Sequence, residues 1–244
     1  MPRGVIPDEG VLLVGGTFDP PHRAHVELAR RARDRRRAGA GLVFVPAARS
    51  PHKSSGPLAS DSERAAMLEL AIESVEHAGV WTDEIDRAAS GEPSYWIDTL
   101  ERARSLVGDA WLGFVLGADQ AVAFDRWREA RRILKLAEPL VLLREPWGSA
   151  EVLLGAMRDA WSDAELERWA SWCVDVGTMD VSATEIRALL RDDRENARLE
   201  SLLSPGVLGF IRERGLYRAD AERKGGGWGR SVGLGGRRRS KKKR

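Results

Sequence analysis

Two histidines follow a pair of glycines near the N-terminus, in the stretch Gly15-Gly-Thr-Phe-Asp-Pro-Pro-His-Arg-Ala-His25. An apolar run precedes Gly15 and a helical pattern begins near His22, so this stretch is expected to join a strand to a helix. Glycines let backbone N–H groups approach a ligand closely, and a helix N-terminus favours anions. His22 and His25, three residues apart, share one face of the first turn. The combination predicts a phosphate site whose imidazoles donate hydrogen bonds as negative charge grows.

Two simpler interpretations of these residues are a tight turn and a metal site. Glycines between a strand and a helix often serve the turn alone. Histidines at this spacing could also bind zinc, but the chain holds only two others, His52 and His77, and a single cysteine, Cys173, distant in sequence. We therefore expect a phosphate site and no metal held by protein ligands.

The elements that must position these residues alternate between strand and helix patterns. The expected strands are 11–15, 42–46, 80–82, 111–116 and 139–143, and the expected helices are 22–37, 94–106, 127–136, one opening at Ser60 and one opening at Ser182. The last two begin with the spacing of a capping box. Strands separated by helices predict an α/β fold with a Rossmann-like, doubly wound and mainly parallel sheet, followed by a small helical C-terminal part. Such sheets bind ligands at the carboxyl ends of their strands.

The formal net charge of +2 conceals two oppositely charged parts. Residues 221–244 hold ten basic residues and one acidic residue, a net charge of +9, which leaves −7 for residues 1–220. The segment 221–244 is also rich in glycine, so we expect a disordered tail with weak contact to a polyanion or RNA. Residues 1–220 are expected to form one domain, with its motifs between residues 11 and 218.

Several classes of protein do not fit this chain of 244 residues, of which 43% are hydrophobic. Its apolar runs are too short to span a bilayer, and the first ten residues lack the apolar core of a signal peptide. One cysteine cannot form an internal disulfide, which argues against a disulfide-stapled secreted scaffold. We expect a cytoplasmic protein.

The motif from Gly15 to His25 resembles the nucleotidyltransferase superfamily whose signature is His-x-Gly-His, and its form resembles bacterial nicotinate-nucleotide adenylyltransferases. The resemblance implies that both histidines bind the phosphates of ATP and that His25 contacts the phosphate under attack. It also implies that the motif's first residues contribute to ATP binding, namely Gly15, Gly16, Thr17 and Phe18.

Five further stretches resemble motifs of the same family, in the same order. Each alone has a plainer interpretation as a loop, a helix cap or a core residue. The resemblance implies a catalytic Lys53 in Ser50-Pro-His-Lys53, and an adenosine site at Gly117 and Asp119. Mononucleotide contacts are implied for Ser94, Tyr95, Trp96 and Trp127. Near the C-terminus it implies nucleotide contacts for Ser182 and Thr184, a catalytic Arg187 that reaches the triphosphate, and only a packing role for the final Gly-Leu-Tyr-Arg218.

The reaction implied is attack by the phosphate of nicotinate mononucleotide on the α-phosphorus of ATP, which yields nicotinate adenine dinucleotide and pyrophosphate. Mg²⁺ would arrive with ATP and keep mostly water and phosphate ligands. Three residues depart from the family pattern: Pro21, Ala24, which replaces the glycine of the signature, and Trp96, which replaces a threonine. Trp96 leaves the choice between acid and amide mononucleotides open.

Two alternatives to this reaction remain. The acceptor could be nicotinamide mononucleotide or phosphopantetheine, which also carry a phosphate. The chain could instead be an RNA-binding module on a degenerate nucleotide fold, as its basic tail suggests, although the histidine pair and Arg187 would then have no role.

Overall fold

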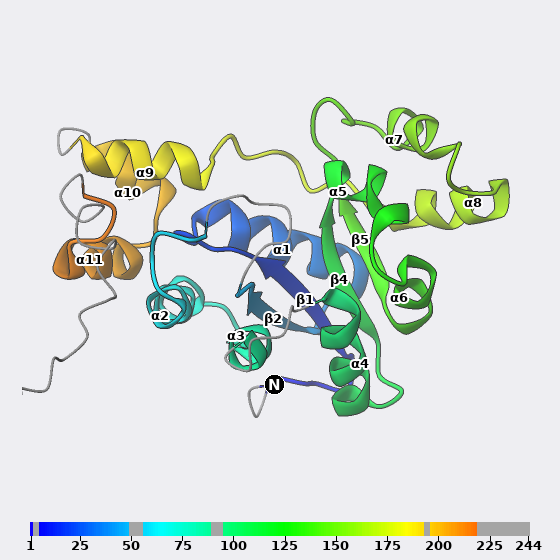
Figure 1. Ribbon diagram of the computed structural model, residues 1–244, viewed down its shortest axis with the longest axis horizontal. Helices are drawn as coiled ribbons and strands as arrows, with labels where there is room; N and C mark the ends of the chain where they lie inside the picture. The colour runs from blue at the N-terminus through cyan, green and yellow to red at the C-terminus, as the bar shows by residue number, and fades with distance from the viewer. Residues whose placement is uncertain (2–4, 49–55, 89–94, 193–195, 219–244) are drawn as a thin grey trace, which may run out of the picture.

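A computed structural model describes the chain except for residues 2–4, 49–55, 89–94, 193–195 and 219–244 (Figure 1). The segment 221–244, expected to be a disordered tail, lies outside the described residues, as do Lys53 and Ser94. None of the described helices is long and apolar enough to cross a membrane.

A parallel sheet with the strand order β3-β2-β1-β4-β5-β6 forms the centre of the molecule. Its strands are β1 (Val11–Gly16), β2 (Gly41–Pro46), β3 (Ala78–Val80), β4 (Leu112–Gly117), β5 (Glu138–Leu142) and β6 (Cys173–Val174). The chain builds outward from β1 to β3 on one side and from β4 to β6 on the other. The order therefore reverses between β1 and β4, where a doubly wound sheet opens a crevice for a ligand.

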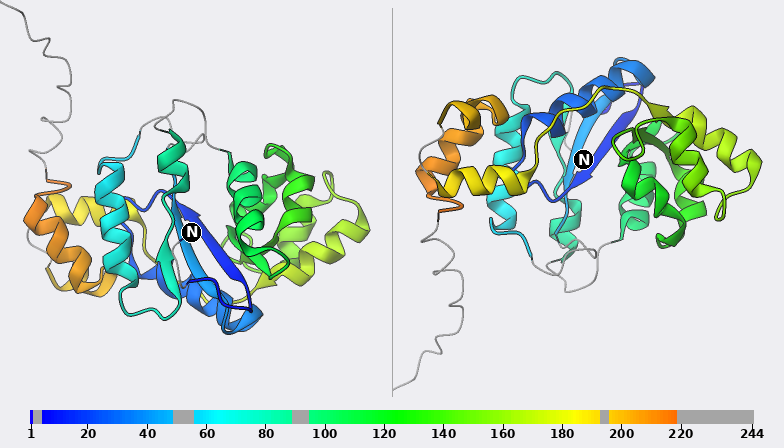
Figure 2. Two further views of the ribbon diagram at one scale, coloured as in Figure 1. Left: turned by 90° about the horizontal axis from the view of Figure 1, so that it is seen from below. Right: turned by 90° about the horizontal axis from the view of Figure 1, so that it is seen from above.

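Helices cover both faces of this sheet (Figures 1 and 2). They are α1 (Arg23–Arg37), α2 (Asp61–Ile72), α3 (Asp83–Ala88), α4 (Trp96–Val107), α5 (Ala118–Val122), the 3₁₀ turn η1 (Phe124–Arg126), α6 (Ala130–Leu136), α7 (Ala150–Met157), α8 (Asp163–Trp172), α9 (Ala183–Arg191), α10 (Asn196–Leu202) and α11 (Pro205–Arg214). Alternation along β1 divides the core: Leu12 and Val14 pack with α1 and α2, whereas Val11 and Leu13 pack with α4, α6, α7 and α8. The predicted α/β class and doubly wound sheet are confirmed.

Most expected elements are present, and the differences have local causes. The capping box that opens α2 forms as predicted, with the Ser60 hydroxyl accepting from the Glu63 N–H. The third strand lies two residues earlier than expected, at Ala78–Val80. The helix expected over 127–136 is wrong at its start, because Glu129 has a left-handed backbone and α6 begins only after it. The helix expected from Ser94 begins at Trp96, and Tyr95 is its N-cap.

The small helical part after the sheet, α9 to α11, packs on α2 through its own apolar cluster. A polar contact also ties it to the loop after β1. The Tyr217 hydroxyl, buried at the end of this part, donates to the Asp19 carboxylate at 2.8 Å. The desolvation of Tyr217 and the neighbouring negative charge of Asp19 raise the pKa of the phenol far above its usual range, so it stays a donor. The Gly-Leu-Tyr-Arg ending therefore does more than pack, contrary to the expectation from sequence.

Replacement of Tyr217 by phenylalanine tests this tie. Tyr217→Phe removes one donor from a buried carboxylate, and hydrogen bonds to charged groups contribute about 1.5–3 kcal/mol. We expect the free energy of unfolding in urea to fall by about 2 kcal/mol. Tyr95→Phe, the same chemical change at a half-buried ring, is the control. Equal and small losses in both variants would contradict the proposed role of the Tyr217 hydroxyl.

Candidate functional site

The carboxyl ends of β1 and β4 lie next to each other at the point where the sheet order reverses. The first ends in Gly15 and Gly16, and the second ends in Gly117, directly before α5. Two of the predicted motifs, far apart in the sequence, therefore meet at one edge of the sheet. This is the place where a parallel α/β sheet binds its ligand.

The glycines at the end of β1 are needed by aromatic side chains of the protein itself. A Cβ at Gly16 would lie 2.9 Å from the ring of Phe18, and a Cβ at Gly15 would lie 3.0 Å from the ring of Trp96. Phe18 has a left-handed backbone (φ 51°), and its ring is buried and meets the His25 ring edge-on at 5.0 Å. The glycines therefore bring Trp96 beside β1 and let Phe18 support the second histidine. Phe18, expected at the ATP site, directs its side chain into the core.

The two histidines are held together at the first turn of α1. Their rings stack with centroids 3.6 Å apart, and the backbone N–H of His22 donates to Nδ1 of His25 at 3.1 Å. Because Nδ1 accepts this bond, a neutral His25 carries its proton on Nε2. His22 is buried, and the loss of hydration lowers its pKa from 6.5 to about 4. His22 is therefore uncharged at neutral pH.

The start of α9 lies against the loop that carries the histidines. The Arg187 guanidinium donates to the backbone oxygen of Asp19 at 2.6 Å and to the Thr184 hydroxyl at 3.2 Å. The Ser182 hydroxyl accepts the Glu185 N–H at 3.1 Å and so caps the helix. The structure thus brings together residues more than 160 positions apart, as the motifs predict. Glu185 does not complete a capping box: its carboxylate pairs with Arg198.

Asp119, expected to hold adenosine, is paired within the protein. Its carboxylate accepts a bond of 2.6 Å from Arg144 and one of 3.2 Å from Gln120. A Cβ at Gly117 would lie 2.8 Å from the same carboxylate, which explains the glycine. Arg144 was not predicted from sequence, because nothing near it in the chain resembles a motif. It places a cation beside the expected adenosine site.

Of the three aromatic residues expected at the mononucleotide site, Tyr95 and Trp96 lie at the start of α4 and Trp127 follows η1. Trp96 contacts Gly15 and packs against Phe114, and Trp127 packs against Phe124 with centroids 4.9 Å apart. The indole N–H groups of Trp96 and Trp127 are both buried, and within the part of the chain that the structure describes neither has a hydrogen-bond partner. Tyr95 lies beneath the guanidinium of Arg128, 4.4 Å from the ring centroid. Unpaired buried donors are uncommon, and Trp161 and Trp169 of the core are two further examples among the described residues.

One buried cation that supports the site was missed by the sequence analysis. Arg64 of α2 is fully buried and donates to the backbone oxygen of Thr17 at 2.6 Å and to Asp61 at 2.5 Å. It holds the first residues of the motif loop, including Thr17, which was expected to bind ATP. The sequence signal is its spacing, because Arg64 stands three and four residues before the buried Met67 and Leu68 and so shares their side of the helix.

Comparisons with known proteins agree with this geometry. The model of the cytidylyltransferase-like family matches residues 13–189. A protein of Chromobacterium violaceum named "probable nicotinate-nucleotide adenylyltransferase" is 34% identical over 212 residues, which cover 84% of this chain and 96% of that protein. A protein of Aeromonas hydrophila with the same name is 35% identical over 216 residues, again 84% and 96% of the two chains. The chain belongs to the nicotinate-nucleotide adenylyltransferase family.

Solved structures show the same fold for this member of the family. The nicotinic acid mononucleotide adenylyltransferase of Plasmodium falciparum, complexed with NaAD, superposes with a TM-score of 0.63 at 16% identity. The alignment covers 85% of this chain and 96% of the other. Among the described residues of this adenylyltransferase-family chain, no group of three or more histidine, cysteine, aspartate or glutamate side chains could hold a metal ion.

The lowered pKa of His22 predicts how acid destabilises the chain. Between pH 6.5 and about 4 the unfolded chain binds a proton at His22 that the folded chain does not, so stability falls as the pH falls through this window. We expect the wild type to lose up to about 3 kcal/mol of unfolding free energy relative to His22→Asn between pH 7 and pH 4.

Urea unfolding of both proteins at several pH values gives this difference. Subtraction removes the contributions of other groups, such as buried Glu84, whose desolvation raises its pKa to about 7 and acts in the opposite direction. Parallel stability curves for the two proteins would show that His22 titrates normally in the folded chain.

Proposed function

We propose that this chain transfers AMP from ATP to nicotinate mononucleotide, giving nicotinate adenine dinucleotide and pyrophosphate in NAD biosynthesis. The observation that carries the proposal is the meeting of two different half-sites at the carboxyl end of β1. The histidine pair and Arg187 lie on one side, and Trp96 lies on the other, against Gly15. One half-site offers donors for phosphates, and the other offers aromatic surface and free indole donors for a pyridine nucleotide.

The chemistry needs orientation and neutralisation of charge more than proton transfer. The mononucleotide phosphate is itself the nucleophile, so no covalent enzyme intermediate is required. His25, with its proton on Nε2, donates to the α-phosphate as charge grows there, and neutral His22 fixes the position of its ring. Arg187 and Lys53 hold the departing pyrophosphate.

The remaining nucleotide contacts follow the motifs. The backbone of Gly15, Gly16, Thr17 and Phe18 faces the ATP phosphates, and Gly117 with Asp119 receives the adenosine. Ser182 and Thr184 present the N-terminus of α9 to the nucleotide, an arrangement that favours anions. Ser94, Tyr95, Trp96 and Trp127 hold the mononucleotide.

Mg²⁺ fits this site as a companion of ATP rather than as an ion held by carboxylates. Asp19, three residues before His22 in the same loop, already accepts three hydrogen bonds and pairs with Arg187. Asp119 is occupied by Arg144. An ion coordinated by phosphates and water would supply charge neutralisation at the triphosphate.

Two of the departures from the family pattern are accommodated inside the protein. Both Pro21 and Ala24 are buried, and Pro21 also lines the groove beside α1. Trp96 differs because its ring lies at the site itself. We propose that it favours the acid form of the mononucleotide, since its buried N–H suits an anionic acceptor.

An assay of pyrophosphate release tests the reaction directly. With ATP and Mg²⁺, we expect release with nicotinate mononucleotide and a lower rate with nicotinamide mononucleotide, while phosphopantetheine should give none. His25→Ala should reduce kcat by about 10²–10³-fold, because it removes a donor to the developing charge. Circular dichroism checks that this variant stays folded. Absence of release from either mononucleotide would overturn the proposed reaction.

Removal of residues 221–244 separates the tail from the site. We propose that the tail makes only weak contacts with polyanions such as RNA, since its +9 charge lies outside the motif-bearing part. The chain ending at residue 220 should therefore keep its kcat and KM values within about twofold of the full chain while losing salt-sensitive RNA binding. A collapse of adenylyl transfer would place the tail in the active site.

A further inference from the structure

Helix α1 is strongly basic although residues 1–220 are acidic overall. It holds seven arginines and two carboxylates, a net charge of +5 over 15 residues. Cations are favoured near a helix C-terminus, where the last three arginines stand. Several arginines along the helix also bind backbone oxygens of segments that are distant in the sequence.

One of these segments connects β6 to α9. It runs alongside α1 toward the far side of the molecule, as seen in Figure 1 and on the right of Figure 2. We define it as the linker, residues 175–182. It leads directly into the capped start of α9, where Thr184 and Arg187 lie beside the histidine loop.

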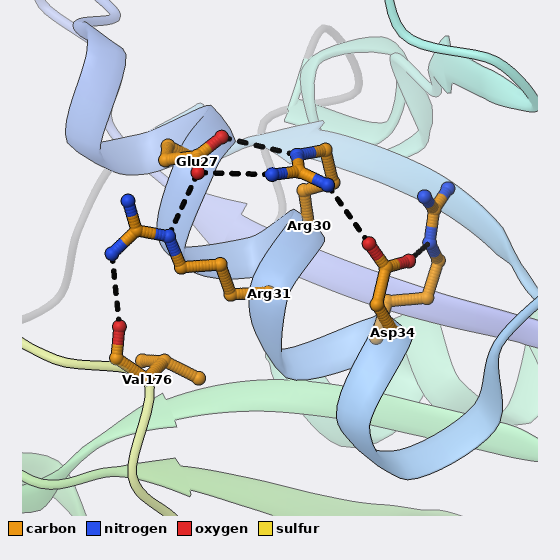
Figure 3. A network of polar contacts seen from close by, with 6 residues as sticks. Glu27, Arg30, Arg31, Asp34 and Val176 are labelled. Carbon is orange, nitrogen blue, oxygen red and sulfur yellow. Dashed lines mark hydrogen bonds and ion pairs between the residues drawn. The ribbon is translucent and has the colours of Figure 1, made fainter.

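Arg31 and Arg35 attach the linker to α1. Nη1 of Arg31 donates to the backbone oxygen of Val176 at 3.1 Å, and Arg35 donates to that of Asp175. Glu27 fixes the other side of the Arg31 guanidinium through a bond of 2.7 Å to its Nε (Figure 3). The planar Arg31 guanidinium, bound to Glu27 through Nε and to Val176 through Nη1, therefore holds the linker against α1 in one orientation.

Beyond Val176 the linker borders a groove before it reaches α9. Arg31 and Met179 are among the residues that line this groove, which has a volume of about 590 Å³. Gly177 has a left-handed backbone (φ 73°), and both Gly177 and Thr178 are exposed. The linker is thus fastened at Val176 and again where Arg187 contacts Asp19, with an open span between these points.

We propose that Arg31, supported by Glu27, is a positioning residue for ATP. By fixing the linker at Val176 it holds the N-terminus of α9, with Ser182, Thr184 and Arg187, in the place from which it meets the nucleotide. Val176 itself is buried and packs in the core, so the loss of Arg31 loosens the linker without releasing it. This inference rests on the proposed function of that helix start.

Kinetics of Arg31→Ala test the inference. One charge-assisted hydrogen bond can change the equilibrium between an attached and a detached linker about tenfold or more. Only part of this free energy is expected to change the affinity for ATP, because the linker is held at other points as well. We expect the KM for ATP to rise about three- to tenfold, with kcat and the KM for nicotinate mononucleotide changed less than about twofold. Arg31→Lys should restore part of the loss, since lysine can still donate to Val176 but lacks the fork.

Arg33→Ala is the matched control. Arg33 lies on the same helix, carries the same charge and also donates to a backbone oxygen, but that oxygen belongs to Glu76, before β3. It should leave both KM values unchanged. If the KM for ATP rises equally in both variants, its cause is a general loss of stability or of positive charge on α1. That result would overturn the proposal.

Two further measurements identify the route of the effect. Hydrogen exchange of the amides at 177–184 should accelerate in Arg31→Ala and stay unchanged in Arg33→Ala. Combination with Thr184→Ala should give less than the product of the two single effects on the KM for ATP, because both act through α9. Unchanged exchange, or independent effects, would contradict the proposal. If the wild type transfers no AMP, the proposed function fails, whereas the exchange experiment still tests the attachment of the linker.

Discussion

The site depends on the contacts that the buried Asp19 carboxylate makes with distant parts of the chain. It accepts the backbone N–H groups of Leu58 and Ala59 at 2.9 and 3.1 Å, and the Tyr217 hydroxyl at 2.8 Å. The Arg187 guanidinium lies 3.9 Å from it and also binds the backbone oxygen of the same residue. A charge removed from water is tolerated only when such partners replace its hydration. The stretch before α2, the start of α9 and the end of the C-terminal part are thus fixed to one loop.

This arrangement suits the proposed binding of a polyphosphate, although residues 1–220 carry a net charge of −7. Hydrogen bonds within the protein fix the arginines around the histidine loop. Arg187 is held by Asp19 and Thr184, and Arg64 is held by the backbone oxygen of Thr17. His22 stays uncharged at neutral pH, because burial lowers its pKa to about 4. Local geometry therefore decides the function, and the net charge of the chain carries little information about it.

The sequence predicted what depends on local patterns. The capping of α2 by Ser60 follows from spacing alone, and the apolar run 11–15 indicated the buried strand β1. The predicted order of strands and helices implied a crevice beside β1, and the structure confirms that Gly117 ends the neighbouring strand. The C-terminal helical part was also expected.

What escaped prediction depends on contacts between distant residues. Nothing in the sequence around Asp19 shows that Tyr217, 198 positions later, will donate to its carboxylate. Arg64, Arg144 and the ring of Trp96 against Gly15 are likewise products of the tertiary fold. The start predicted for α6 was wrong. The apolar periodicity favours a helix from residue 127, but the left-handed backbone of Glu129 delays the helix to Ala130. Lys53 and Ser94 stay predictions, since they lie outside the described residues.

A double-mutant cycle on unfolding free energy tests the central role of Asp19 most directly. The cycle joins Asp19→Asn with Tyr217→Phe, each measured alone and together in urea. If the carboxylate and the phenol stabilise the fold through each other, the coupling free energy should be about 1–2 kcal/mol. Effects that add to within about 0.5 kcal/mol would contradict the account, because the Tyr217 hydroxyl would then not hold the C-terminal part through the Asp19 carboxylate.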